Sequence, residues 1–78
     1  MIVYDEYKKL FTGERHLVDW QFGLGGDFNN ALFDAISKAD ELNLAKLEMG
    51  FPEEVIAFRR YSREYGYWEN IEKRIYGN

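Results

Sequence analysis

The sequence predicts an all-α fold, a compact bundle of four to five short helices in one small domain spanning residues 1–78. Apolar residues recur at three- and four-residue steps in several segments, which is the period of a helix with one buried face. Gly13, Gly50 and Gly66 fall where these segments end. Cysteine is absent, and six Phe, six Tyr and two Trp supply the mass of the core in place of disulfides.

The first predicted helix covers residues 2–12, and we expect Thr12 and Gly13 to end it, since glycine commonly follows a helix end. Its apolar face consists of Val3, Tyr7, Leu10 and Phe11, with Tyr4 at the edge.

Residues 14–26 fit two interpretations. Trp20, Phe22 and Leu24 alternate with polar residues or glycine, as they would in a strand, but no other segment offers a partner strand. The favoured interpretation is a short helix or turn from about residue 15 to 22, followed by a glycine-rich bend. The alternative is a strand that pairs only across a dimer.

The segment Asp27–Ala39 is predicted to be the helix against which the others pack, with Asp27 as its N-cap. Phe33 falls outside its main apolar face, which consists of Phe28, Ala31, Leu32, Ala35, Ile36 and Ala39. A further helix is expected over residues 41–49, with Asp40 as its cap. Because its apolar residues surround the whole helix, it should lie between other elements.

Phe51-Pro52-Glu53-Glu54 is a clear helix start, because proline suits the first helical position and carboxylates suit the first turn. This helix should run to about Tyr65, with Gly66 ending it. Its inward residues are expected to be Val55, Phe58, Tyr61 and Tyr65. A last helix should extend to about Tyr76, with Trp68, Ile71 and Ile75 on its apolar side.

The composition predicts an acidic cytoplasmic protein. The net charge of −4 disfavours general nucleic-acid binding, and no apolar run approaches a membrane span or forms a secretion signal. Residues 1–55 carry five basic and eleven acidic residues, a net of −6, whereas residues 56–78 carry five and three, a net of +2. This polarity suits contacts within the fold or a bipartite partner.

Gly23, Gly25 and Gly26 precede a predicted helix, as glycines do in phosphate-binding loops. However, no strand comes before them and no Lys-Ser or Lys-Thr pair follows. Asp27 would also place a negative charge where the phosphate belongs. A tight turn between helices is the preferred interpretation.

His16 is the only histidine, and without cysteine or a second histidine it is a poor zinc ligand. No serine or cysteine lies near it in sequence to act as a nucleophile. The acidic residues considered as metal ligands are Asp34, Asp40, Glu41, Glu48, Glu53 and Glu54. They lack a Glu-x-x-His pair and are interpreted as surface charge. We therefore predict no catalytic, metal-binding or cofactor-binding residue and no cofactor.

The C-terminal half interleaves arginines with Tyr61, Tyr65 and Trp68, a mixture that can bind nucleic acid. The preferred interpretation places these aromatic residues in the core and pairs the arginines with the acidic first half. The predicted partner-binding patch consists of Ile56, Arg59, Arg60 and Arg63, together with Phe33 if that ring lies outward.

Several short motifs, among them Trp20-Gln21-Phe22-Gly23-Leu24 and Gly50-Phe51-Pro52-Glu53-Glu54-Val55, resemble a set found in short proteins of phages and prophages of Gram-positive bacteria. The resemblance covers most of residues 11–70. It implies a small accessory protein acting in the host cytoplasm, and it carries no catalytic residue onto this chain.

The predicted function is that of a non-enzymatic accessory protein that binds a host or phage protein and inhibits or modulates a host factor. A homodimer is the alternative partner. Two other functions remain open: binding of a small phosphorylated ligand or nucleotide through Gly25, Gly26 and the arginines, and nucleic-acid binding through the basic C-terminal half. An enzyme is the least favoured, because no acid, base and nucleophile set can be assembled.

Overall fold

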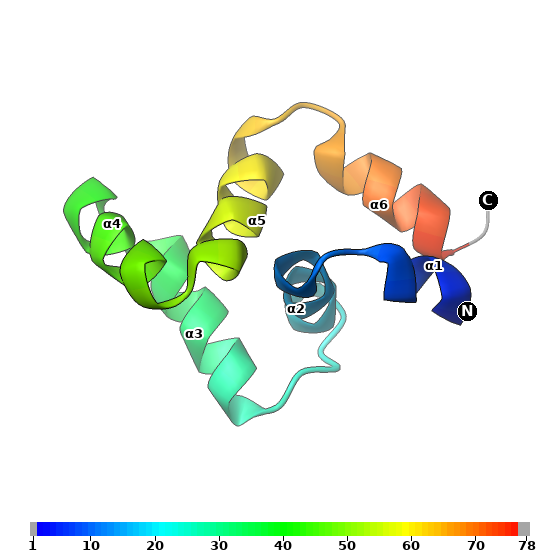
Figure 1. Cartoon of the computed structure of the whole chain (residues 1–78), viewed down its shortest axis with the longest axis horizontal. Helices are drawn as coiled ribbons and strands as arrows, with labels where there is room; N and C mark the ends of the chain where they lie inside the picture. The colour runs from blue at the N-terminus through cyan, green and yellow to red at the C-terminus, as the bar shows by residue number, and fades with distance from the viewer. Residues whose placement is uncertain (1, 77–78) are drawn as a thin grey trace.

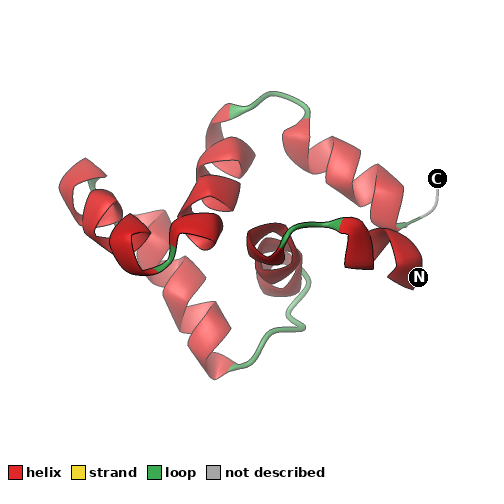
Figure 2. Cartoon of the chain, in the orientation of Figure 1, coloured by secondary structure: helices red, strands yellow, loops and turns green. Residues whose placement is uncertain are grey.

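Six α-helices follow one another in the computed structural model, which describes residues 2–76 (Figures 1 and 2). They are α1 (Tyr4–Lys9), α2 (Thr12–Gln21), α3 (Asp27–Lys38), α4 (Glu41–Gly50), α5 (Pro52–Arg63) and α6 (Tyr67–Ile75). No strand occurs between residues 2 and 76. The predicted all-α fold is confirmed, and residues 14–26 form a helix and a bend rather than a strand. Over the same residues, no helix is long and apolar enough to cross a membrane.

The number of helices exceeds the predicted four to five because the segment predicted as a short helix or turn, from about residue 15 to 22, is a full helix, α2. Leu10 and Phe11 have extended backbones, so α1 ends at Lys9 and α2 begins at Thr12. The Glu14 carboxylate accepts a hydrogen bond from the Phe11 amide at 3.3 Å and satisfies one of the free donors at the start of α2. Thr12 and Gly13 therefore start a helix and do not end one.

Gly13 is required by the packing of α2 on α5, which form the most extensive helix pair in the structure. A Cβ atom at Gly13 would lie 2.2 Å from the carbonyl oxygen of Glu53, closer than real Cβ contacts come. The Gly13 amide also donates to the Glu53 carboxylate at 3.3 Å. The glycine thus allows the backbones at the starts of the two helices to touch.

Helix α2 lies at the centre of the molecule, seen end-on in Figure 1 with the other helices around it. Its Leu17 and Val18 are fully buried. The other almost fully buried apolar residues are Leu10, between α1 and α2, and six residues of α3, α5 and α6: Phe33, Ile36, Val55, Ala57, Ile71 and Ile75. The prediction that the others pack around Asp27–Ala39 is therefore wrong, since α2 and α5 together hold that position.

Leu32 and Ile36 of the predicted apolar face of α3 are buried as expected, but the inward face is rotated toward Phe33. Phe28 is 69% exposed, whereas Phe33 is fully buried and stacks on Trp20 with ring centroids 5.4 Å apart. Burying an aromatic ring removes more apolar area from water than burying Ala31 and Ala35, both of which are exposed. Phe33 cannot belong to a partner-binding patch. The N-cap is Gly26, and Asp27 is the first helical residue.

Helix α4 packs on α5 and is not enclosed. Leu44 is buried on the side facing α5, but Leu42 and Met49 are 69% and 87% exposed on the other side. The predicted position between two elements is therefore wrong. Its predicted cap is confirmed, because the Asp40 carboxylate accepts the Asn43 amide at 2.8 Å.

Pro52 begins α5 as predicted, and the helix ends at Arg63, two residues early. Tyr65 is fully exposed and not inward-facing. Gly66 adopts a left-handed conformation with φ of 82° and starts α6. Helices α1 and α6 lie side by side (Figure 1), joined by a hydrogen bond from the Val3 amide to the Ile75 carbonyl.

Seven of the aromatic residues form one connected set between α2, α3, α5 and α6. Trp20 contacts the rings of Phe33, Phe58 and Tyr61, and Tyr61 in turn contacts Trp68 edge-on with centroids 5.6 Å apart. Phe22 continues the set to Trp68 and Tyr76. Most of the aromatic mass of this short chain therefore builds its core.

Candidate protein-interaction surface

The four predicted partner-binding residues lie along α5 at three- and four-residue steps, so they share one side of that helix. Ile56 is 44% exposed, and the arginines flank it. Each arginine nevertheless has a partner within the fold.

Arg59 and Arg63 reach across to carboxylates on α4. Arg59 Nη1 lies 3.3 Å from Glu41 Oε2 and its Nη2 lies 3.5 Å from Glu48 Oε1. Arg63 Nη2 lies 2.5 Å from Glu41 Oε1. These hydrogen bonds, first from Arg59 and then from Arg63, hold the pKa of Glu41 below its ordinary value of 4.5. The resulting ion pairs join α4 to α5 and fix the direction of both guanidinium groups.

Arg60 faces a different neighbourhood. Its guanidinium pairs with Glu64 at 2.9 Å, lies 3.8 Å from Glu14, and sits 4.3 Å from the centroid of the Tyr67 ring. Glu14 is only 8% exposed and accepts the Tyr67 hydroxyl at 2.6 Å. Arg60 therefore contacts residues where α2, α5 and α6 meet, and replacing it would disturb the core.

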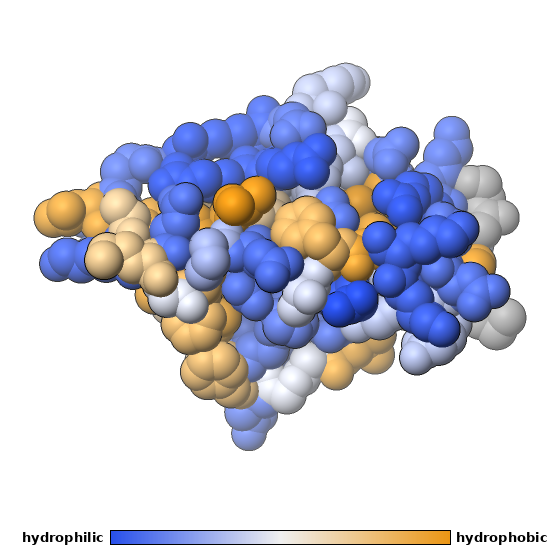
Figure 3. Space-filling model, in the orientation of Figure 1, coloured by the Kyte–Doolittle hydropathy of each residue, from blue (hydrophilic) through white to orange (hydrophobic). Residues whose placement is uncertain are grey.

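An apolar stripe lies on the side of α4 that faces away from α5. Leu42, Ala45 and Met49 are all exposed and follow the helical repeat on one side of α4. In Figure 3, apolar side chains gather at the end of the molecule that α4 occupies. We call this stripe, together with Ile56, Arg59 and Arg63, the α4–α5 surface.

Sequence reasoning missed Leu42 and Met49 as surface residues, although the signal was present. The apolar residues of 41–49 are distributed around the whole helix, which indicates two faces that must be covered, and we predicted that the chain itself covers both. In the structure, the chain covers only one of these two faces.

A separate groove of about 490 Å³ lies between the end of α2 and the starts of α3 and α5. Gly25 and Gly26 line it, as do Asp19 and Glu54, but no lysine or arginine does. His16 Nδ1 lies 2.7 Å from Glu54 Oε2, so the histidine pairs with α5. The predicted glycine bend is confirmed by Gly23, whose φ is 68°.

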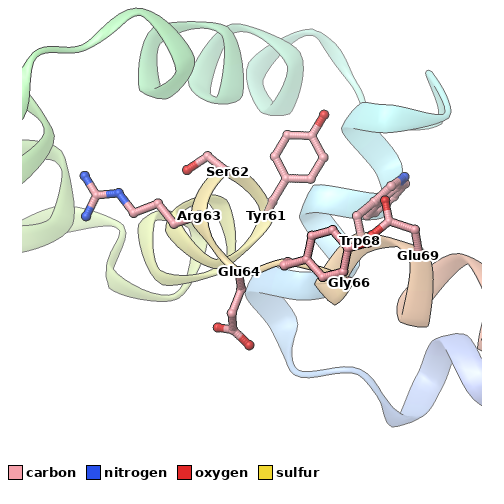
Figure 4. A pocket seen from close by; sticks show the side chains of 8 residues that line it. Tyr61, Ser62, Arg63, Glu64, Gly66, Trp68 and Glu69 are labelled. Carbon is pink, nitrogen blue, oxygen red and sulfur yellow. The ribbon is translucent and has the colours of Figure 1, made fainter.

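A larger and shallower hollow of about 800 Å³ lies at the turn between α5 and α6. Figure 4 shows that its side chains point apart: Arg63, Tyr61 and Glu64 extend in three different directions. A catalytic site needs groups that converge on one reacting atom. This hollow therefore offers no catalytic geometry.

The carboxylates considered as metal ligands are dispersed among structural contacts. Asp34 accepts the Trp20 indole N–H at 3.1 Å, and the others cap helices or pair with side chains of α2 and α5 as given above. Within residues 2–76, no group of three or more His, Cys, Asp or Glu side chains is placed to hold a metal ion.

Comparison of the chain with models of protein families, with curated proteins and with solved structures finds no match. Functional inference therefore depends on the surfaces described above.

Proposed function

We propose that this protein acts without catalysis, by binding another protein through its α4–α5 surface. The observation that carries the proposal is the exposure of Leu42 and Met49, 69% and 87%, on a helix whose opposite side buries Leu44. A helix that is apolar on both sides is normally covered on both. Leaving two large apolar side chains in water favours a partner that covers them.

The charges beside the stripe indicate the chemistry of that partner. Arg59 and Arg63 reach α4 through ion pairs with Glu41, the residue that precedes Leu42 in sequence. A partner therefore meets guanidinium groups that lose little conformational freedom on binding. We propose a partner with apolar side chains flanked by carboxylates, because arginines around apolar residues are common at protein interfaces.

The resemblance to small phage and prophage proteins supports a bacterial host protein as the partner, in the host cytoplasm, with inhibition or modulation of that protein as the outcome. A second copy of this chain is the competing occupant of the same surface.

The two other functions gain less support from the arrangement. Phosphate binding needs Gly25, Gly26 and arginines at one site, but the glycines line a groove with two carboxylates and no arginine. Nucleic-acid binding through stacked bases gains less support because Trp68 packs edge-on against Tyr61, which leaves Tyr65 as the one fully exposed ring of the three interleaved aromatic residues.

The experiment is affinity capture from a lysate of a Gram-positive bacterium, comparing wild type with the double variant Leu42→Asp/Ile56→Asp. Tyr4→Asp is the matched control, since Tyr4 is 67% exposed on α1, outside the proposed surface. We expect a protein that wild type and control retain and the double variant loses, with unchanged circular dichroism. Retention by the double variant would contradict the proposal. Light scattering measures the molar mass of the purified wild type and of the double variant, and so shows whether the lost partner is a second copy of this chain.

A further inference from the structure

The groove between α2, α3 and α5 has an apolar rim and floor. Leu24 and Phe28 stand 60% and 69% exposed at its edge, and the Phe28 ring lies 5.9 Å from the ring of Phe51. Leu32, 8% exposed, contributes to the lining. Two large apolar side chains beside a hollow form a receptor for one apolar side chain of a ligand.

The charge of the groove is negative. Asp19 and Glu54 line it, and Asp27 and Glu53 are adjacent in sequence to lining residues. Across residues 2–76, none of these four carboxylates forms an ion pair with lysine or arginine, and Glu54 pairs only with His16. Other carboxylates of the chain, such as Glu41 and Glu64, do have arginine partners. The groove therefore retains negative charge that a cationic ligand can neutralise.

The walls of the groove are held by hydrogen bonds. The Asn29 side chain donates from Nδ2 to the His16 backbone carbonyl at 3.1 Å and ties the start of α3 to α2. The Leu24 and Gly25 amides donate to the Asp19 carbonyl at 2.8 and 3.3 Å. A groove that is shaped before binding costs less conformational entropy to occupy.

We infer that this groove binds a short peptide segment carrying a leucine or phenylalanine flanked by lysine or arginine. The apolar side chain enters between Leu24 and Phe28, and a cationic side chain reaches Asp19. Glu54, whose side chain is 13% exposed and paired with His16, adds negative charge from the wall of the groove. The inference rests on the proposed function and adds a second contact site for a protein partner. Its charge preference is opposite to that of the α4–α5 surface.

The test is a titration of ¹⁵N-labelled protein followed by NMR, with three synthetic peptides of equal length. The first combines leucine and phenylalanine with lysine and arginine flanks, the second replaces the basic flanks with glutamate, and the third replaces the apolar residues with serine. We expect only the first to shift the amides of Gly25, Gly26 and Asn29, with affinity falling as salt is added.

Two variants locate the binding. Phe28→Ser should weaken the first peptide roughly tenfold because it removes the apolar rim, and Glu54→Gln should weaken it roughly fivefold because it removes a charge. Tyr65→Ser, at a fully exposed residue outside both proposed surfaces, is the matched control and should leave the affinity unchanged. Equal shifts with the glutamate-flanked peptide, or no shift of these amides with any peptide, would overturn the inference.

The two proposals fail separately. In one outcome, Leu42→Asp/Ile56→Asp abolishes capture of the partner, but no peptide shifts the NMR signals of the groove amides. The proposed function would then stand, and the inference of peptide binding at the groove would be wrong. In the other outcome, the first peptide binds the groove, but the double variant still captures the partner. The groove inference would then stand, and the proposed function of the α4–α5 surface would be wrong.

Discussion

Glu14 is the one charged side chain buried in the part of the chain that the structure describes, and its contacts show how single residues determine this fold. Its carboxylate accepts the Tyr67 hydroxyl at 2.6 Å and the Phe11 amide at 3.3 Å, with Arg60 3.8 Å away. Burial, followed by this hydrogen bond, raises the pKa of Tyr67 well above its ordinary value. The hydroxyl therefore remains a donor, and it joins α2 to α6 across 53 positions of sequence.

Tyr67→Phe should lower the free energy of unfolding by about 1–3 kcal/mol, because it leaves a buried carboxylate oxygen without its donor. Urea denaturation measures the change. Tyr65→Phe is the matched control and should have almost no effect, since Tyr65 is fully exposed. Equal effects from the two variants would show that the buried hydrogen bond contributes nothing.

Because of Tyr7, we expect the stability of the fold to fall at alkaline pH. Burial and the hydrogen bond from its hydroxyl to Asp19, at 2.8 Å, raise the pKa of Tyr7 from 10.0 to about 12. Because the folded state holds this proton more tightly than the unfolded state, the stabilisation is complete below pH 10.0 and is lost as pH rises to about 12. The free energy of unfolding, measured with urea between these pH values, should fall less for Tyr7→Phe than for wild type. Parallel declines would exclude this role for Tyr7.

At the scale of helices, some features set by neighbouring residues were predictable from sequence, although the predicted N-cap at Asp27 was wrong, and features set by distant residues were not. The Asp40 cap and the Pro52 start need only adjacent backbone atoms, and both predictions are confirmed. The burial of Phe33 requires Trp20 from another helix, and the exposure of Leu42 requires that nothing else covers α4. Helical periodicity describes one helix and contains no information about where its partners lie.

Gly13 illustrates the same limit and gives a prediction. Gly13→Ala should destabilise the fold by about 1–3 kcal/mol despite alanine's better helix propensity, because the added Cβ would meet the Glu53 carbonyl at 2.2 Å. Gly50→Ala is the control, since nothing lies within 4 Å of the added carbon, and it should be neutral or stabilising by up to about 1 kcal/mol. Thermal unfolding compares them, and a Gly13→Ala protein as stable as wild type would refute the close approach.

Over the whole molecule, the acidic first half and the basic second half meet inside the fold. Arg59 and Arg63 pair with α4, Arg60 lies beside Glu14, and Arg74 pairs with Glu6 at 3.5 Å. The sequence could predict this pairing in general terms, but not which arginines remain available to a partner. That distinction depends on the packing of α4 on α5.

The most direct test of protein binding through the α4–α5 surface is the dissociation constant of the captured partner, measured by calorimetry for wild type and for Leu42→Asp. The account predicts at least a roughly tenfold weaker complex for the variant. Its free energy of unfolding should stay within about 0.5 kcal/mol of wild type, because Leu42 is 69% exposed. An unchanged dissociation constant in an equally stable variant would contradict the account.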